Sequence, residues 1–99
     1  MNMQALMQQA QKMQRDITKK KEELNKKTFV GVYELVEVTF SGDKKLISVN
    51  IKSSGSLDEE DKEILQDMFV IAVNDAMAKI DKETDSMLGA YGSQLNGLL

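Results

Sequence analysis

The first quarter of the chain carries apolar side chains at a mixture of three- and four-residue steps. In heptad notation, position a holds Met3, Ala10, Ile17 and Leu24, and position d holds Leu6 and Met13. This spacing predicts an amphipathic helix from about residue 2 to residue 27, roughly 39 Å long. The next two d positions hold Lys20 and Lys27. Because these charged residues interrupt the apolar seam, a long autonomous coiled coil is not expected.

The middle of the chain alternates with a period of two. The apolar positions in ELVEVTF and KLISVNI are Val36, Val38 and Phe40, then Ile47, Val49 and Ile51. Such alternation predicts two half-buried antiparallel strands. SGDK joins them, with Gly42 available for a positive φ. TFVGV, before the first of them, favours a short edge strand with Gly31 at a bend or bulge.

A second helix is predicted after Gly55. Ser56 and Glu59 fit a capping box, and the acidic run 58–61 suits the positive end of the helix dipole. Apolar side chains then recur at helical spacing on one broad face: Ile64, Leu65, Met68, Phe69, Ala72, Val73, Ala76 and Ile80. Asn74 and Asp75 interrupt this run. Either side chain could cap or bridge to another element, but we expect both to face solvent.

Together these elements predict an α+β fold. One domain over residues 1–88 would hold a long N-terminal helix, an antiparallel sheet of two to three strands and a long C-terminal helix, followed by a flexible glycine-containing tail, 89–99. So small a sheet cannot cover two long helices. We therefore expect an intertwined homodimer, in which a second copy covers the overhang and the sheet edge. The expected core and dimer seam comprises Leu6, Met13, Ile17, Val38, Val49, Met68 and Phe69.

Composition narrows the chemistry. The chain has no cysteine and no histidine, which removes disulfides, thiolate zinc sites and the commonest general base. We expect no enzyme activity, metal, cofactor or small-molecule substrate. The sequence shows no arrangement of carboxylates that would support a carboxylate-dependent hydrolase. No apolar run approaches the roughly 20 residues that span a bilayer, and the N-terminus lacks a signal-peptide layout. These features predict a cytoplasmic protein without a membrane partner.

Charge is distributed unevenly along the chain. Residues 1–27 carry seven basic and three acidic side chains, a net charge of +4, whereas residues 58–99 carry three and ten, a net charge of −7. The seven cations are Lys12, Arg15, Lys19, Lys20, Lys21, Lys26 and Lys27. Four of them fall within an arc of about 60° on the helix, nearly opposite the apolar stripe: Lys12, Arg15, Lys19 and Lys26. A solvated helix face would explain the stripe, but so many cations on one face of an acidic chain favour an anionic partner.

Three segments, in order, resemble the YbaB/EbfC nucleoid-associated DNA-binding family: LMQQAQKMQ (6–14), LVEVTFSG (35–42) and DKEILQDMFVIAVNDAMAKI (61–80). The resemblance covers about residues 3 to 83. It implies a homodimeric fold whose helices project from a shared sheet like tweezers, and binding to duplex DNA at the bacterial nucleoid.

Two functional hypotheses follow. In the first, a homodimer binds duplex DNA with low sequence selectivity in the nucleoid. Lys12, Arg15, Lys19 and Lys26 would contact phosphates, with lesser contributions from Lys20, Lys21 and Lys27. The alternative is a protein–protein interaction module that docks a partner through the Met/Leu stripe of the first helix, which consists of Met3, Leu6 and Met7.

Overall fold

The computed structural model describes residues 2–52 and 55–91 and has the predicted α+β architecture. The elements, in chain order, are α1 (Met3–Lys26), β1 (Thr28–Tyr33), β2 (Val36–Ser41), β3 (Leu46–Ile51), α2 (Glu59–Leu88) and the short 3-10 helix η1 (Gly89–Tyr91). The expected third strand is therefore present as β1. Among the described residues, no helix is both long and apolar enough to cross a membrane.

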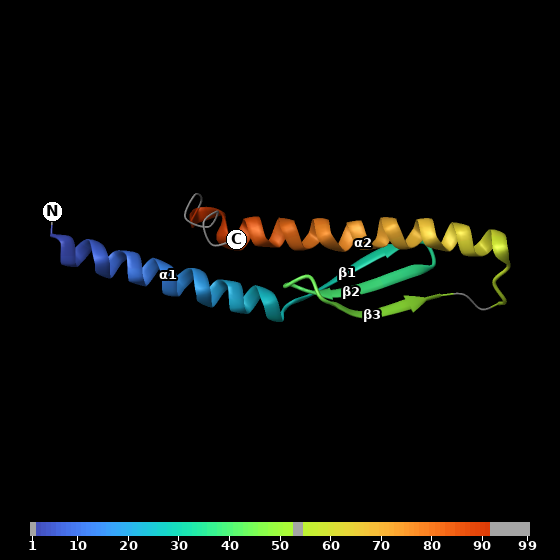
Figure 1. Cartoon of the computed structure of the whole chain (residues 1–99), viewed down its shortest axis with the longest axis horizontal. Coiled ribbons are helices and arrows are strands. Elements are labelled where there is room, and N and C mark those ends of the chain that lie inside the picture. The colour runs from blue at the N-terminus through green and yellow to red at the C-terminus, as the bar shows by residue number, and fades with distance from the viewer. Residues whose placement is uncertain (1, 53–54, 92–99) are drawn as a thin grey trace.

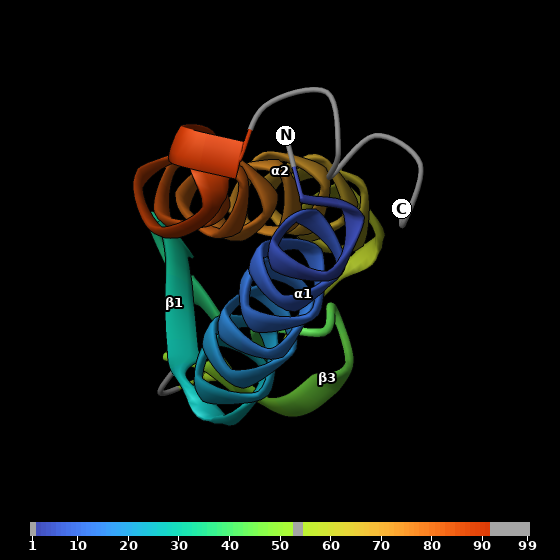
Figure 2. The same ribbon diagram turned by 90° about the vertical axis from the view of Figure 1, so that its left-hand side faces the viewer.

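The molecule is a rod of 70 × 19 × 15 Å. The two helices run in opposite directions along its length, and the N-terminal part of α1 projects beyond the rest of the chain (Figure 1). Viewed along the rod, α2 lies over the sheet, and β1 and β3 form its two edges (Figure 2). Asn2 begins α1 by accepting a hydrogen bond from the Gln4 backbone N–H (3.0 Å).

The sheet is antiparallel, with β2 between β1 and β3. The apolar residues of β2 alternate as predicted, and Val36, Val38 and Phe40 are buried. They pack against Ala72, Ala76 and Ile80, which recur every four residues on one face of α2. α2 covers β1 and β2, so the core lies between this helix and two of the three strands.

Gly31 allows close contact between α2 and β1. The expectation of a bend or bulge at this residue is wrong, because Gly31 pairs in regular register with Val38 and the irregularity lies between β2 and β3 at Thr39 and Phe40. A Cβ at position 31 would lie 2.0 Å from the Ala72 carbonyl oxygen and 2.8 Å from the Ala76 Cβ. A side chain is therefore excluded by the neighbouring helix.

Gly42 is also required by a close approach. The turn does not use Gly42 for a positive φ, because the residue with a positive φ in this turn is Lys44 (φ 65°). A Cβ on Gly42 would lie 1.8 Å from the Leu24 carbonyl oxygen. The Gly42 backbone N–H also donates to the Lys27 carbonyl oxygen (3.0 Å), so the β2–β3 turn is held against the end of α1.

The start of α2 is shifted from its predicted place. Asp58, not Ser56, is the N-cap residue, and its side chain accepts from the Asp61 backbone N–H (2.8 Å). The Asp61 carboxylate accepts in turn from the Asp58 backbone N–H (3.1 Å). The acidic residues of the first turn complement the helix dipole as expected, but the capping box lies two residues further along the chain.

Asp75 binds the outer edge of β1. The expected solvent-facing position is wrong for this residue, whose Oδ2 accepts from the Val32 backbone N–H (3.1 Å). Lys79 forms an ion pair with Asp75 (3.1 Å) and donates to the Val30 carbonyl oxygen (2.6 Å). Asn74 is exposed as predicted. The two α2 side chains thus occupy backbone groups that an edge strand would otherwise present to solvent.

The first three residues of the predicted tail form a short helix. Gly89–Tyr91 form η1, and Tyr91 packs with Met13 and Met87 against the buried pair Ile17 and Leu88. Residues 92–99 lie outside the described residues. The C-terminal end of α2 and η1 therefore support the middle of α1.

We predict that Gly31→Ala lowers the free energy of unfolding by about 1–3 kcal/mol, because the new methyl group overlaps backbone atoms of α2. Urea denaturation followed by circular dichroism measures the change. Gly89→Ala is the control, since Gly89 is in the right-handed helical region and a Cβ there meets nothing within 4 Å. Equal stability of the Gly31 variant and wild type would contradict this packing.

We predict that Asp75→Asn is destabilised at neutral pH and that the difference from wild type disappears in acid. The Val32 N–H and the Lys79 ammonium lower the pKa of Asp75 below 3.8. A lowered folded-state pKa contributes stability above the unfolded value, and this contribution is lost as the pH falls through the folded value. Because the pair is partly exposed, we expect an effect of about 0.5–1 kcal/mol.

Denaturation midpoints measured between pH 7 and pH 2.5 test this dependence on Asp75. Asp67→Asn is the matched control, because Asp67 lies exposed on the same helix and has no ion pair within the described part of the chain. A constant difference between Asp75→Asn and wild type at every pH would contradict the proposed role of the charge.

Candidate nucleic-acid interface

The outer flank of α1 carries four exposed cations. Lys12, Arg15, Lys19 and Lys26 are exposed, and none of them forms an ion pair within residues 2–52 and 55–91. The buried residues of this helix are Ile17 and Leu24, which lie nearly opposite these cations around the helix axis. We refer to Lys12, Arg15, Lys19 and Lys26 as the basic stripe.

The other three basic residues of α1 and its C-cap contact the rest of the fold. The Lys20 ammonium lies 5.0 Å from the centroid of the Tyr91 ring. Lys27 pairs with Glu83 at 3.2 Å. Lys21 is partly buried and lines a cavity between α1, the β2–β3 turn and α2. Among the described residues, four of the seven predicted cations are therefore unpaired at the surface, two contact other parts of the fold, and Lys21 lines a cavity.

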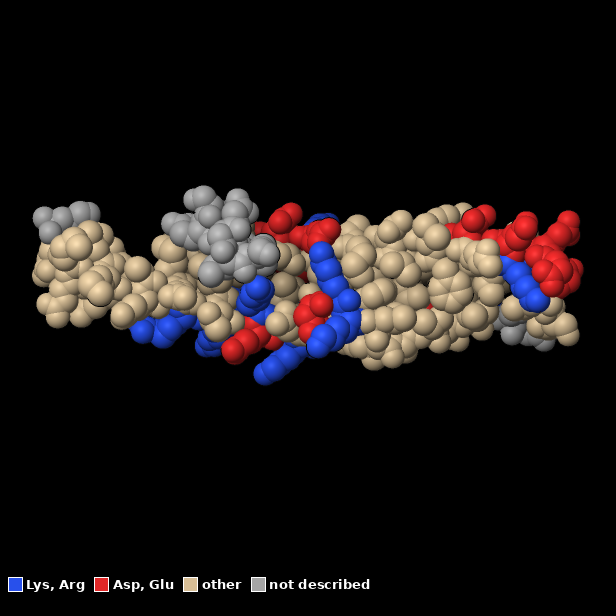
Figure 3. Space-filling model, in the orientation of Figure 1, with Lys and Arg blue, Asp and Glu red and all other residues tan. Residues whose placement is uncertain are grey.

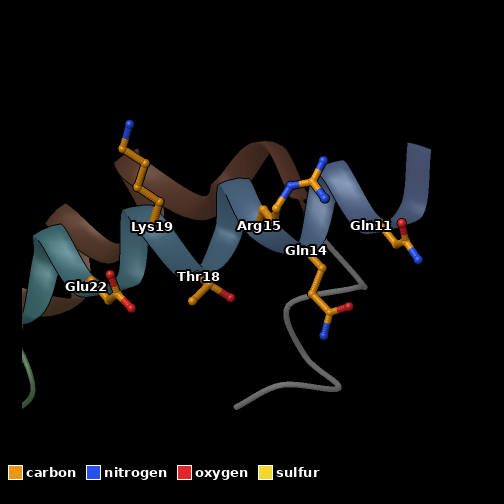
Figure 4. A pocket seen from close by; sticks show the side chains of 6 residues that line it. All are labelled: Gln11, Gln14, Arg15, Thr18, Lys19 and Glu22. Carbon is orange, nitrogen blue, oxygen red and sulfur yellow. The ribbon is translucent and has the colours of Figure 1, made fainter. Parts of the chain in front are cut away.

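Polar side chains lie beside the basic stripe and form a shallow depression with it. The lining residues come from successive turns of α1 (Figure 4): Gln11, Gln14, Arg15, Thr18, Lys19 and Glu22. The charge pattern of the sequence indicates Arg15 and Lys19 but does not indicate the uncharged residues beside them. A spacing of three and four residues is the signal that points to them, because it places Gln11 and Thr18 next to Arg15 on the helix surface and Gln14 next to Gln11 and Thr18.

Acidic side chains collect at one end of the rod, whereas the cations of α1 begin only at Lys12, after an uncharged N-terminal segment. The acidic start of α2, Glu59 to Asp61, lies at the end away from the free part of α1. In the space-filling view, acidic side chains gather there, and several basic side chains follow the underside of α1 (Figure 3). The molecule is therefore electrostatically polar along its long axis.

The expected core and dimer seam is only partly buried in one chain. Ile17 and Val38 are buried, and Met13, Met68 and Phe69 are partly buried against the two apolar clusters. Leu6 and Val49 are 38% and 43% exposed. The two exposed members lie on the projecting end of α1 and on β3.

β3 presents an uncovered apolar face. Val49 pairs with buried Val38 and so shares its side of the sheet. Because α2 covers only β1 and β2, this side of β3 has no helix over it. Leu46, Ile47, Val49 and Ile51 are 53%, 57%, 43% and 39% exposed, respectively. A run of this kind at a sheet edge marks a surface that natural proteins normally cover.

Metal-binding carboxylates do not converge in the structure. Within the described ranges, no group of three or more acidic side chains is placed to hold a metal ion. The acidic run at the start of α2 instead caps its helix through Asp58 and Asp61. The described carboxylates are thus accounted for by capping, ion pairs and solvent exposure.

A family model and several known proteins match this chain over most of its length. The family model described as the YbaB/EbfC DNA-binding family matches residues 1–95. A nucleoid-associated protein of Enterococcus faecalis is 45% identical over 98 residues, which cover 97% of this chain and 93% of that protein. A nucleoid-associated protein of Ligilactobacillus salivarius is 43% identical over 100 residues, covering 99% and 95% of the two chains.

A solved structure shares the fold. The crystal structure of an uncharacterized protein from Helicobacter pylori superposes with a TM-score of 0.77 at 20% identity, covering 92% of this chain and 97% of that one. The agreement between the family model, which spans almost the whole sequence, and relatives of similar length shows that this chain belongs to the YbaB/EbfC DNA-binding family.

Proposed function

We propose that this protein binds duplex DNA in the bacterial nucleoid, as a homodimer and with low sequence selectivity, through the basic stripe of α1. The observation that carries the proposal is the set of four exposed cations without carboxylate partners in the described chain. The names of the family and of the two relatives support DNA and the nucleoid as partner and location. Those names describe DNA-binding proteins, and we propose no enzymatic activity.

The basic stripe has the chemistry of a phosphate-binding surface. Lys12 and Lys26 are fourteen residues apart, which corresponds to about 21 Å along the helix. Duplex DNA carries one negative charge per roughly 1.7 Å of its axis, so several phosphates lie within reach of such a stripe. Three of the four cations are lysines, which act as point charges and carry little information about base identity.

The remainder of the chain favours approach of DNA from the α1 side. Residues 58–99 carry a net charge of −7, and α2 lies alongside the sheet rather than alongside the free end of α1 (Figure 1). This charge repels a polyanion. Lys20 and Lys27 are held by Tyr91 and Glu83, so we assign them and Lys21 a supporting role.

A second copy of the chain would cover the exposed apolar surface. The open face of β3 needs a partner, whereas the outer edge of β1 is occupied by Asp75 and Lys79. In such a homodimer two basic stripes would act on one duplex. Linking the two sites raises the affinity for one long polyanion above that of either stripe alone.

A second candidate function rests on the apolar stripe of the free end of α1. Met3, Leu6 and Met7 are 72%, 38% and 59% exposed. Methionine-rich helix faces adapt well to partner surfaces. These three residues would then dock a partner protein through apolar contacts.

We predict a strong salt dependence of DNA binding. If about six phosphates are neutralised per dimer, a plot of log affinity against log salt concentration has a slope near −5. Fluorescence anisotropy with a labelled duplex at several salt concentrations measures it. A slope near zero would defeat the proposal.

Replacing Lys12, Arg15, Lys19 and Lys26 together by glutamine should weaken binding to every duplex by at least about tenfold at 0.1 M salt and flatten the salt slope, because the phosphate contacts are lost. The fold should persist, since all four side chains are exposed. The control replaces Lys44, Lys45, Lys52 and Lys62 by glutamine, which removes the same charge elsewhere. Equal loss in both variants would indicate only a net-charge effect, and unchanged affinity in the first would place the site elsewhere.

Met7→Lys separates the two functions. An apolar docking surface should lose its partner on this change and should tolerate salt, whereas a phosphate-binding surface should bind DNA at least as tightly with one more cation. Anisotropy titrations of wild type and Met7→Lys at two salt concentrations distinguish them. Salt-insensitive binding that Met7→Lys abolishes would favour the docking function.

A further inference from the structure

The free end of α1 carries a line of exposed amide side chains. Residues 2–11 contain no charged residue, and the segment 4–14 contains five glutamines. Taking Lys12 as the origin and 100° per residue, Gln4, Gln8 and Gln11 lie at about 280°, 320° and 260°. Arg15 lies at about 300° in the same projection. The three glutamines therefore continue the basic stripe toward the N-terminus on the same side of the helix.

These amides point to solvent and are unpaired as far as the described residues show. Gln4, Gln8 and Gln11 are exposed, and none of their side chains takes part in a hydrogen bond among the described residues. Figure 4 shows Gln11 extending from α1 next to Gln14 and Arg15. Three unpaired amides in line with a phosphate-binding surface supply donors and acceptors but no charge.

The segment that carries them can enter a groove. In the described part of the chain, α1 first packs against other elements at Met13 and Ile17, and the turns before Met13 project from the body (Figure 1). A single helix with its side chains is about 10–12 Å wide, and the major groove of DNA is about 12 Å wide. Gln4 and Gln11 are about 10.5 Å apart along the axis, the length of three base-pair steps of 3.4 Å.

From this placement we infer that Gln4, Gln8 and Gln11 read base edges in the major groove and give the protein a preference for A·T pairs, while the basic stripe holds the flanking phosphates. Glutamine suits adenine, because its amide accepts from N6 and donates to N7 at once. This inference rests on the DNA-binding function proposed above and refines it. Binding to all duplexes comes from the cations, and a moderate selectivity comes from the amides.

The test compares anisotropy titrations of three duplexes. One is A·T-rich, one is G·C-rich, and the third is the A·T-rich duplex with 7-deazaadenine in place of adenine. We expect wild type to prefer the A·T-rich duplex over the G·C-rich one by about tenfold. Replacing adenine N7 by carbon removes the major-groove acceptor, so the deaza duplex should lose most of this preference. A preference that survives the deaza substitution would place the readout in the minor groove and overturn the inference.

Two neighbouring glutamines provide a matched pair of variants. Gln8 lies on the amide line, whereas Gln9 lies about 100° away around the helix. Both are exposed, and both substitutions to alanine raise helix propensity equally. Gln8→Ala should reduce the A·T preference, Gln9→Ala should retain it, and the triple variant Gln4→Ala, Gln8→Ala, Gln11→Ala should abolish it without changing the salt slope.

The outcomes separate the inference from the proposed function. If the salt slope is near −5 but the triple variant keeps the wild-type preference, or Gln9→Ala loses as much as Gln8→Ala, the amide readout is wrong and DNA binding stands. The readout is equally wrong if wild type binds all three duplexes alike. If no duplex binds, or the slope is near zero, both proposals fail.

Discussion

The close packing of α2 on the sheet controls the arrangement of everything else in this chain. Ala72 and Ala76 are fully buried, and the backbone at Gly31 approaches Ala72 so closely that no Cβ fits between them. Small residues on both sides bring the helix axis near the strands and increase the contact of Val36, Val38 and Ile80. Because α2 is a continuous helix, its packing against β1 and β2 also determines where the turns beyond the sheet lie.

Two consequences follow from the position of α2. Its Asp75 and Lys79 reach the outer edge of β1 and occupy backbone groups of Val32 and Val30, which leaves the opposite edge, β3, open. Its last turns extend past the sheet, where Leu88 packs against Ile17 of α1. Within the described residues, the packing that supports α1 begins at Met13, so its first turns project from the body and its basic stripe faces away from it.

The charge distribution fits this geometry. Carboxylates at the start of α2 satisfy backbone N–H groups and the helix dipole, and they lie at the end of the rod far from the free part of α1 (Figure 3). Lys27, the C-cap residue of α1, is engaged by Glu83, and Lys20 is engaged by Tyr91. Among the described residues, the cations of the basic stripe are unpaired and point outward. Binding a polyanion there would therefore break no contact within the chain.

The sequence by itself determined the type and order of the elements and the side of α1 that carries the basic stripe. Both follow from periodicity, which depends only on the 3.6-residue turn of a helix and the two-residue repeat of a strand. It did not determine the roles of Gly31, Gly42 and Asp75, or the engagement of Lys20 and Lys27. Only the tertiary structure decided these, because each depends on a neighbour distant in the chain, such as Val32 for Asp75 or Glu83 for Lys27. The periodicity of the sequence specifies which face of a helix or strand a residue occupies. The packing of the elements specifies which residues that face contacts.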